Sequence, residues 1–119
     1  MLSNVLVVDN ETRLRATISM LLQNSGYQVS IAEDGVKALS RLGEDLYRLV
    51  LLDLELPDIP GIEILRTIRS SYPNLLVVIL TSEASPDIIQ EALELGVNDY
   101  LLKPSDPNFI IEKLRNLLS

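Results

Sequence analysis

The 119-residue sequence contains no cysteine and no histidine. Without cysteine, neither a disulfide framework nor a zinc–thiolate site can form. Without histidine, the chain cannot use His-based general-base catalysis, a Ser-His-Asp or Cys-His nucleophile system, or imidazole metal ligands. Any bound metal ion must therefore be held by oxygen atoms, which favours magnesium, calcium or manganese.

Long apolar runs and an excess of positive charge are absent as well. No apolar stretch approaches the length of a membrane span, and the N-terminus lacks a signal-peptide pattern. The net charge of −7 disfavours a general nucleic-acid-binding surface. The length predicts a single domain over residues 1–119, and we expect it to be soluble and cytoplasmic, with no membrane association.

Short apolar runs alternate with amphipathic segments along the whole chain. The apolar runs predict strands at 5–8, 27–32, 49–53, 75–80 and 100–102. Helical spacing, capping residues and glycine stops predict helices at 12–24, 34–43, 62–71, 86–95 and 107–118. This order, with short connections, predicts an α/β fold. We expect a doubly wound, five-stranded parallel sheet with helices on both faces and the flavodoxin-like strand order 2-1-3-4-5.

The chain is organised around residues 49–61. The apolar run from Leu49 to Leu52 is typical of a strand buried on both faces, and it stops at Asp53. Pro57, Pro60 and Gly61 then mark a loop. A carboxylate is thus placed at the carboxyl end of a core strand, the edge where open α/β sheets bind ligands. An isolated acid there is commonly structural, so the residues at the other strand ends must show whether Asp53 belongs to a functional site.

Polar side chains follow the other strands too. The first strand ends at Asp9, Asn10 and Glu11, the fourth at Thr81 and the fifth at Lys103. If the first and third strands are neighbours, these groups meet in one shallow pocket with Asp53. The chemistry that fits is phosphoryl transfer, with Asp53 as the nucleophile that forms an acyl-phosphate. A magnesium ion, a Thr81 hydrogen bond and the Lys103 charge would stabilise the phosphoryl oxygens.

The motifs VVDNE (7–11), LLDLELPDIPG (51–61), ILTSE (79–83) and DYLLKP (99–104) resemble the receiver domain of bacterial two-component response regulators. The resemblance covers essentially the whole chain, with matching order and spacing. It implies a domain that acts as a phosphorylation-dependent switch and not as an enzyme. Its chemistry would at most be magnesium-dependent self-phosphorylation from small donors and self-dephosphorylation. The resemblance implies that Asp53 is the phospho-acceptor and that Asp9, Asn10, Asp53 and the Glu55 carbonyl are ligands of Mg²⁺, with Mn²⁺ as the alternative ion. It implies that Thr81 and Tyr100 form the switch pair and that Lys103 is the phosphate-binding lysine. The accessory residues would be Glu11, Ser82 and Pro104, with Pro104 following a cis peptide bond.

One position departs from the family pattern. Asn10 stands where the family usually has a second acid that ligates magnesium directly. An amide oxygen can coordinate but carries no formal charge, so we expect weaker magnesium binding, with Glu11 as a candidate to compensate. Pro60 also replaces an acid found in many members, and we expect only a loop effect there.

The partners follow from the same resemblance. Since the chain has no histidine, its phosphate must come from a sensor histidine kinase, a phosphotransfer protein or a small donor. The helix from Pro86, the last strand and the helix from Pro107 would form the face that meets an output domain or a second copy, with Ile89 and Phe109 as candidate contacts. Arg13 and Arg15 are either a solvated face or a docking site for the phosphodonor.

Three other functions compete with the receiver-domain interpretation. The five glycines form neither a G-x-G-x-x-G motif nor a Walker loop, which disfavours a nucleotide-binding enzyme. A phosphatase with an aspartate nucleophile normally needs a second acid just after the nucleophile, and Glu55 offers one two residues on, but the chain has no room for a cap domain. The remaining alternative is a receiver-like binding module that is not phosphorylated, suggested by Asn10.

Overall fold

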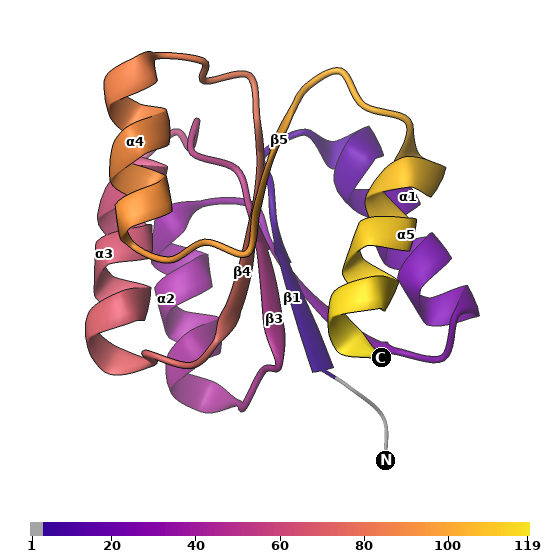
Figure 1. Cartoon of the computed structure of the whole chain (residues 1–119). Helices are drawn as coiled ribbons and strands as arrows, with labels where there is room; N and C mark the ends of the chain where they lie inside the picture. The colour runs from indigo at the N-terminus through magenta and orange to yellow at the C-terminus, as the bar shows by residue number, and fades with distance from the viewer. Residues whose placement is uncertain (1–3) are drawn as a thin grey trace.

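The computed structural model describes residues 4–119, which form one five-stranded sheet with the strand order β2-β1-β3-β4-β5 (Figure 1). All four neighbouring pairs are parallel. The predicted doubly wound architecture is therefore confirmed. The strands are β1 (Asn4–Val8), β2 (Gln28–Ala32), β3 (Leu49–Leu52), β4 (Leu76–Thr81) and β5 (Asp99–Leu102). The helices are α1 (Thr12–Asn24), α2 (Gly35–Glu44), α3 (Gly61–Ser71), α4 (Pro86–Glu94) and α5 (Pro107–Leu118).

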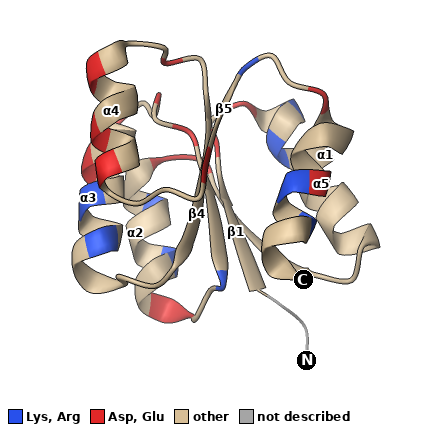
Figure 2. Cartoon of the chain, in the orientation of Figure 1, with Lys and Arg blue, Asp and Glu red and all other residues tan. Residues whose placement is uncertain are grey.

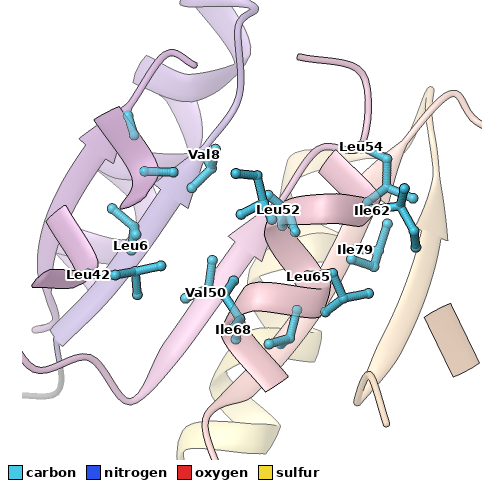
Figure 3. Close-up of a cluster of buried hydrophobic side chains, with 14 of the residues drawn as sticks. Leu6, Val8, Leu42, Val50, Leu52, Leu54, Ile62, Leu65, Ile68 and Ile79 are labelled. Carbon is cyan, nitrogen blue, oxygen red and sulfur yellow. The ribbon is translucent and has the colours of Figure 1, made fainter. Parts of the chain in front are cut away.

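The helices cover both faces of the sheet, with α2, α3 and α4 on one side and α1 and α5 on the other (Figure 1). Successive side chains of a strand point to opposite faces, so each central strand supplies both apolar layers. In β3, Val50 and Leu52 join the layer under α2–α4, whereas Leu49 and Leu51 join the layer under α1 and α5. Figure 3 shows the first layer, where Val50 and Leu52 lie near Leu65 and Ile68 of α3. None of the helices in residues 4–119 is long and apolar enough to span a bilayer.

The register of the sheet aligns the ends of the central strands. Val8 pairs with Ala32 on one side and with Leu52 on the other, and Leu52 pairs with Ile79. Asp9 and Asp53 directly follow Val8 and Leu52, so the two acids leave adjacent strands at the same level. Their N–H groups continue the ladder, since that of Asp53 donates to the carbonyl oxygen of Val8 at 2.9 Å.

Most helix ends lie where the capping residues predict them. The Asp34 and Asp106 side chains accept hydrogen bonds from backbone N–H groups in the first turns of α2 and α5. Gly26 and Gly96 follow α1 and α4 with φ of 94° and 74°, the left-handed conformation that ends a helix at little cost for glycine.

The start and end of α2 differ from the expected pattern. Gly43 does not stop this helix, which continues to Glu44. Val36, an apolar residue in its first turn, is 61% exposed. The residues that α2 buries are Gly35, Ala38 and Leu42, and Leu39 is partly buried against the same apolar layer. The direction of a short helix's inner face is fixed by the sheet beneath it, and small residues can form that face.

Candidate functional site

Asp53 is a buried carboxylate at the carboxyl end of β3, with 4% of its surface exposed. Its Oδ1 atom accepts hydrogen bonds from the Thr81 hydroxyl at 2.7 Å and from the Glu55 N–H at 2.9 Å. Its Oδ2 atom accepts one from Lys103 Nζ at 2.8 Å. The structure therefore brings together the predicted nucleophile, hydroxyl and amine from three different strand ends. Figure 2 shows that acidic residues gather in the loops at this edge of the sheet.

Among residues 4–119, Lys103 is the only cation that forms ion pairs with the carboxylates of this site. Besides Asp53, its Nζ atom lies 3.0 Å from Asp9 Oδ2 and 2.5 Å from Glu11 Oε2. Burial alone lowers the pKa of Lys103, but its hydrogen bonds to Asp53, Glu11 and Asp9 outweigh burial and raise that pKa above its ordinary value. The lysine is thus held fully charged at neutral pH. The peptide bond to Pro104 is cis, as expected.

Asp9 lies beside Asp53 and is equally buried, with 3% of its surface exposed. Burial raises the pKa of Asp9, and the neighbouring negative charge of Asp53 adds to this, while hydrogen bonds from Glu11 N–H and Lys103 act in the opposite direction. Two carboxylates in one buried pocket therefore have a single ammonium group to balance them both. This excess of negative charge favours a further cation in the pocket.

The donor set for such a cation consists entirely of oxygen. Residues 4–119 contain no group of three or more acidic side chains arranged to hold a metal ion. Asp9 and Asp53 supply two carboxylates, so the remaining ligands would be neutral oxygens. Asn10 and Glu55 are exposed at the rim, where an amide oxygen and a main-chain carbonyl oxygen are available. These donors suit a small, hard divalent ion such as Mg²⁺. Ser82 and Pro104 are also exposed at this edge, and the hydrogen bonds to the Asp53 carboxylate come from Glu55, Thr81 and Lys103 instead.

Tyr100 lies in β5, half-buried against the apolar layer under α2–α4. Its hydroxyl donates a 2.7 Å hydrogen bond to the carbonyl oxygen of Glu83, in the loop between β4 and α4. Burial raises the pKa of Tyr100 to about 12, with further contributions from the charges of Glu83 and Asp53. The phenol therefore stays protonated and able to donate. The ring packs against this apolar layer while the Thr81 hydroxyl is bonded to Asp53.

Arg15 has a structural position that the sequence did not indicate. Neither a solvated face nor a docking site describes it, because Arg15 is 9% exposed and donates from Nη1 to the carbonyl oxygen of Asp9 at 2.7 Å. It thereby fixes the turn that follows β1. Only Arg13 of the pair is exposed on α1. Helical spacing from Ile18 and Leu22, which bury the same face, is the signal that could have placed Arg15 inside.

Asp58 is a second residue of the site's framework that the sequence reasoning missed. Its carboxylate accepts hydrogen bonds from the N–H groups of Gly35 and Val36 at 2.8 and 2.9 Å. These bonds lower the pKa of Asp58. The loop that carries Asp53 is therefore tied to the amino end of α2, where the helix dipole favours a negative charge.

Comparison with known proteins shows which family the chain belongs to. The sequence model of the response regulator receiver domain family matches residues 5–115. The chain belongs to this family. A receiver domain protein from Methanospirillum hungatei JF-1, described as CheY-like, has a solved structure that superposes with a TM-score of 0.95 at 29% identity, covering 99% of this chain and 94% of that one. The chemotaxis protein CheY4 of Vibrio cholerae gives a TM-score of 0.88 at 30% identity, covering 98% and 99%.

The curated relatives of this receiver domain are longer proteins. The transcriptional regulatory protein ZraR of Klebsiella oxytoca is 37% identical over 116 residues, which cover 98% of this chain and 25% of that protein. The transcriptional regulatory protein ResD of Bacillus subtilis is 33% identical, over 98% of this chain and 48% of that protein. The chain thus spans at most half the length of the first several curated relatives it matches. Its function is that of a receiver domain in two-component signal transduction, and a receiver-like module outside such signalling is not favoured.

Proposed function

We propose that Asp53 is the residue phosphorylated in this receiver domain. The observation that carries the proposal is the pairing of its two oxygens, one with the Thr81 hydroxyl and the other with Lys103, in a buried pocket at the end of β3. A carboxylate oxygen of Asp53 would attack the phosphorus atom of the donor. As the new oxygen–phosphorus bond forms, the bond to the donor's leaving group breaks, and an acyl-phosphate remains on Asp53.

Lys103 and Thr81 are proposed to recognise the phosphoryl group. Lys103 already donates to Asp53 and carries a raised pKa, so it offers a fixed positive charge for a phosphoryl oxygen. The Thr81 hydroxyl lies 2.7 Å from Asp53 and can rotate to donate to the modified side chain instead. Both groups are in position before the reaction, so little reorganisation is needed.

Mg²⁺ is the proposed cofactor, with Mn²⁺ as the alternative. When bound, it would neutralise negative charge on the phosphoryl oxygens. Asp9, Asp53, the Glu55 carbonyl and the Asn10 amide would hold it, which fits the oxygen-only donor set and the surplus of buried negative charge. Because Asn10 supplies no charge, we propose that the affinity is lower than a third carboxylate would give. Glu11 is available to compensate, but in this structure it is engaged by Lys103.

The output is proposed to arise at the face formed by α4, β5 and α5. Leu93 of α4, Leu102 of β5 and Phe109 of α5 expose 57%, 44% and 47% of their surface, so each of the three elements carries an exposed apolar side chain. Ile89, the other candidate contact, is half-buried. Phosphorylation would shift the population of two conformations through Thr81 and Tyr100, and the face formed by α4, β5 and α5 would meet an output domain or a second copy in one of them.

The phosphodonor is proposed to be a sensor histidine kinase or a phosphotransfer protein, acting on a cytoplasmic domain. Family membership supports this, and because residues 1–119 contain no histidine, the phosphoryl group cannot come from a histidine within this domain. We propose no direct nucleic-acid contact for this domain, in line with its net charge of −7. Catalysis by the domain itself would be limited to self-phosphorylation from small donors and self-dephosphorylation.

Intact-mass analysis after incubation with acetyl phosphate and MgCl₂ tests the proposal. We expect one added phosphoryl group on the wild-type chain, none on Asp53→Asn, and none when EDTA removes the metal. Glu55→Gln is the matched control, because it neutralises an exposed acid in the same loop but keeps the main-chain carbonyl. Equal labelling of wild type and Asp53→Asn would refute the assignment, and undiminished labelling in EDTA would refute the metal requirement.

A further inference from the structure

Helix α4 is held more weakly by the core than its neighbour α3. Among its residues only Ala92 is buried, whereas α3 buries five. Ile88 adds a partly buried side chain nearer the amino end. Leu95 and Val97 add partly buried side chains just after α4, and the polar contacts at the two ends of the helix complete its attachment. These polar contacts differ in kind.

The carboxyl end of α4 is held by Arg69 of α3. The guanidinium donates to the carbonyl oxygen of Leu95 at 2.6 Å and to that of Gly96 at 3.0 Å, just where α4 ends. It also donates to the carbonyl oxygens of Leu75 at 2.6 Å and Tyr72 at 3.3 Å, in the connection to β4. All four acceptors belong to the main chain.

This arrangement is a strong one for a helix terminus. A cation near the last carbonyl groups complements the negative end of the helix dipole, and charged donors make stronger hydrogen bonds than neutral ones. Burial lowers the pKa of Arg69, but an arginine remains charged at neutral pH. Its rigid fork can also engage several carbonyl groups at once, which a lysine cannot do. Arg69 thus joins α4, α3 and the start of β4.

The amino end of α4 is connected to the phosphorylation pocket instead. Its N-cap residue, Ser85, makes no side-chain capping bond. The preceding Glu83 is held by the Tyr100 hydroxyl at its carbonyl oxygen, and its N–H donates to the Thr81 hydroxyl at 3.3 Å. Since Thr81 itself donates to Asp53, a continuous set of hydrogen bonds runs from Asp53 to the loop before α4.

We propose that Arg69 is a positioning residue that fixes the carboxyl end of α4, so that α4 pivots about this end when Asp53 is modified. This inference rests on the proposed function, because the pivot is driven through Thr81. Displacement is then largest at residues 83–89 and small at 93–97. The half-buried Ile89 lies on the moving part, whereas Leu93, beside the anchor, stays in place. Arg69 thereby selects which part of the output face changes.

The anchor can be tested without any phosphoryl mimic, by amide hydrogen exchange in Arg69→Met. The amides of Leu95 and Gly96 are bonded within the last turn of α4 and report its opening. We expect them to exchange about tenfold faster or more in this variant, because charged hydrogen bonds are lost, with little change at Ile89. Arg69→Lys keeps the charge but not the planar guanidinium group, so its exchange rates should lie between those of the wild type and of Arg69→Met. It also provides a milder variant if Arg69→Met is poorly folded.

Arg66→Met is the matched control, one turn earlier on α3. Arg66 also contacts α4, but through an exposed ion pair with the Glu91 side chain at 2.5 Å. Such pairs contribute little, so we expect a change in exchange at Leu95 of less than about twofold. An equally large effect in Arg66→Met, or unchanged exchange in both Arg69 variants, would overturn the anchor.

The pivot itself is tested by NMR with beryllofluoride and Mg²⁺, where beryllofluoride stands in for the phosphoryl group. We expect wild-type amide shift changes to be large over residues 83–89 and small over 93–97, and to spread into 93–97 in Arg69→Met. Uniform changes along α4 in the wild type would overturn the pivot while leaving the proposed function intact. No response at Asp53 and Thr81 would overturn the proposed function and the pivot together, whereas the exchange experiment would still decide whether Arg69 is an anchor.

Discussion

Gly61 is the residue whose substitution tests most sharply how the loop after Asp53 is built. A Cβ atom at this position would lie 2.3 Å from Leu54 Cα and 2.7 Å from the carbonyl oxygen of Asp53. Ordinary contacts begin at 3.4 Å, so the main chain would have to move by about 1 Å, and no flexible side chain can yield in its place. The N–H of Gly61 also donates to the Leu54 carbonyl at 2.9 Å, which keeps the two segments together.

The expected cost of Gly61→Ala is about 3 kcal/mol of unfolding free energy, the upper part of the range for overpacking. This is a large share of the roughly 5–15 kcal/mol that stabilises a typical domain. The forced movement falls on Asp53 and Leu54, so we also expect slower phosphorylation by acetyl phosphate in the fraction that remains folded.

Urea unfolding followed by far-UV circular dichroism measures the effect, with Gly43→Ala as the matched control. Gly43 is exposed within α2, and a Cβ there meets nothing within 4 Å. That substitution should stabilise the protein by about 0.5–1 kcal/mol, because alanine favours a helix over glycine. The two substitutions should therefore change stability in opposite directions. A Gly61→Ala variant within about 0.5 kcal/mol of wild type would show that the close approach of the two segments is not tight.

Three further substitutions give distinct outcomes. Asn10→Asp should bind Mg²⁺ more tightly, on the order of tenfold, because it adds a charged ligand; an NMR titration giving equal affinities would show that another group supplies the ligand. Thr81→Ala should lose about 2 kcal/mol of stability with its bond to Asp53, and should reduce the beryllofluoride shift changes beyond the pocket; full-size changes would remove Thr81 from the switch. Asp58 has a pKa lowered below its ordinary 3.8 by backbone N–H groups at the start of α2. Its stability advantage over Asp58→Asn is therefore present above pH 3.8 and is lost as the pH falls below it. Urea unfolding from pH 7 to 3 tests this, with the exposed Asp45→Asn as control, and a pH-independent difference would contradict it.

The sheet and the cluster of site residues could be predicted because both depend on local patterns. A strand buried on both faces needs a continuous apolar run, as at Leu49–Leu52, and the observed strand has these bounds. Parallel strands all end at one edge, so polar residues that follow them must meet there. Asp9, Asp53, Thr81 and Lys103 do so, and the functional roles proposed for them extend that geometry.

The contacts that hold the site in place could not be predicted in the same way. Arg15, Asp58 and Arg69 all donate to or accept from main-chain groups whose positions depend on how helices and loops pack. A charged residue on a helix is most often solvated, so the sequence alone gave Arg15 no distinct role. The exposure of Val36 has a related reason, since the buried face of α2 consists partly of Gly35 and Ala38, which a search for large apolar residues overlooks.

The central claim is that Asp53 forms an acyl-phosphate, and chemical trapping locates it directly. The chain is incubated with acetyl phosphate and Mg²⁺, then treated with borohydride, which reduces an acyl-phosphate to an alcohol and converts the aspartate to homoserine. Peptide mass spectrometry should find this conversion at residue 53 alone, and only when Mg²⁺ is present. Conversion at Asp9 instead, or an acid-stable phosphate on a serine or threonine with residue 53 unmodified, would contradict the account.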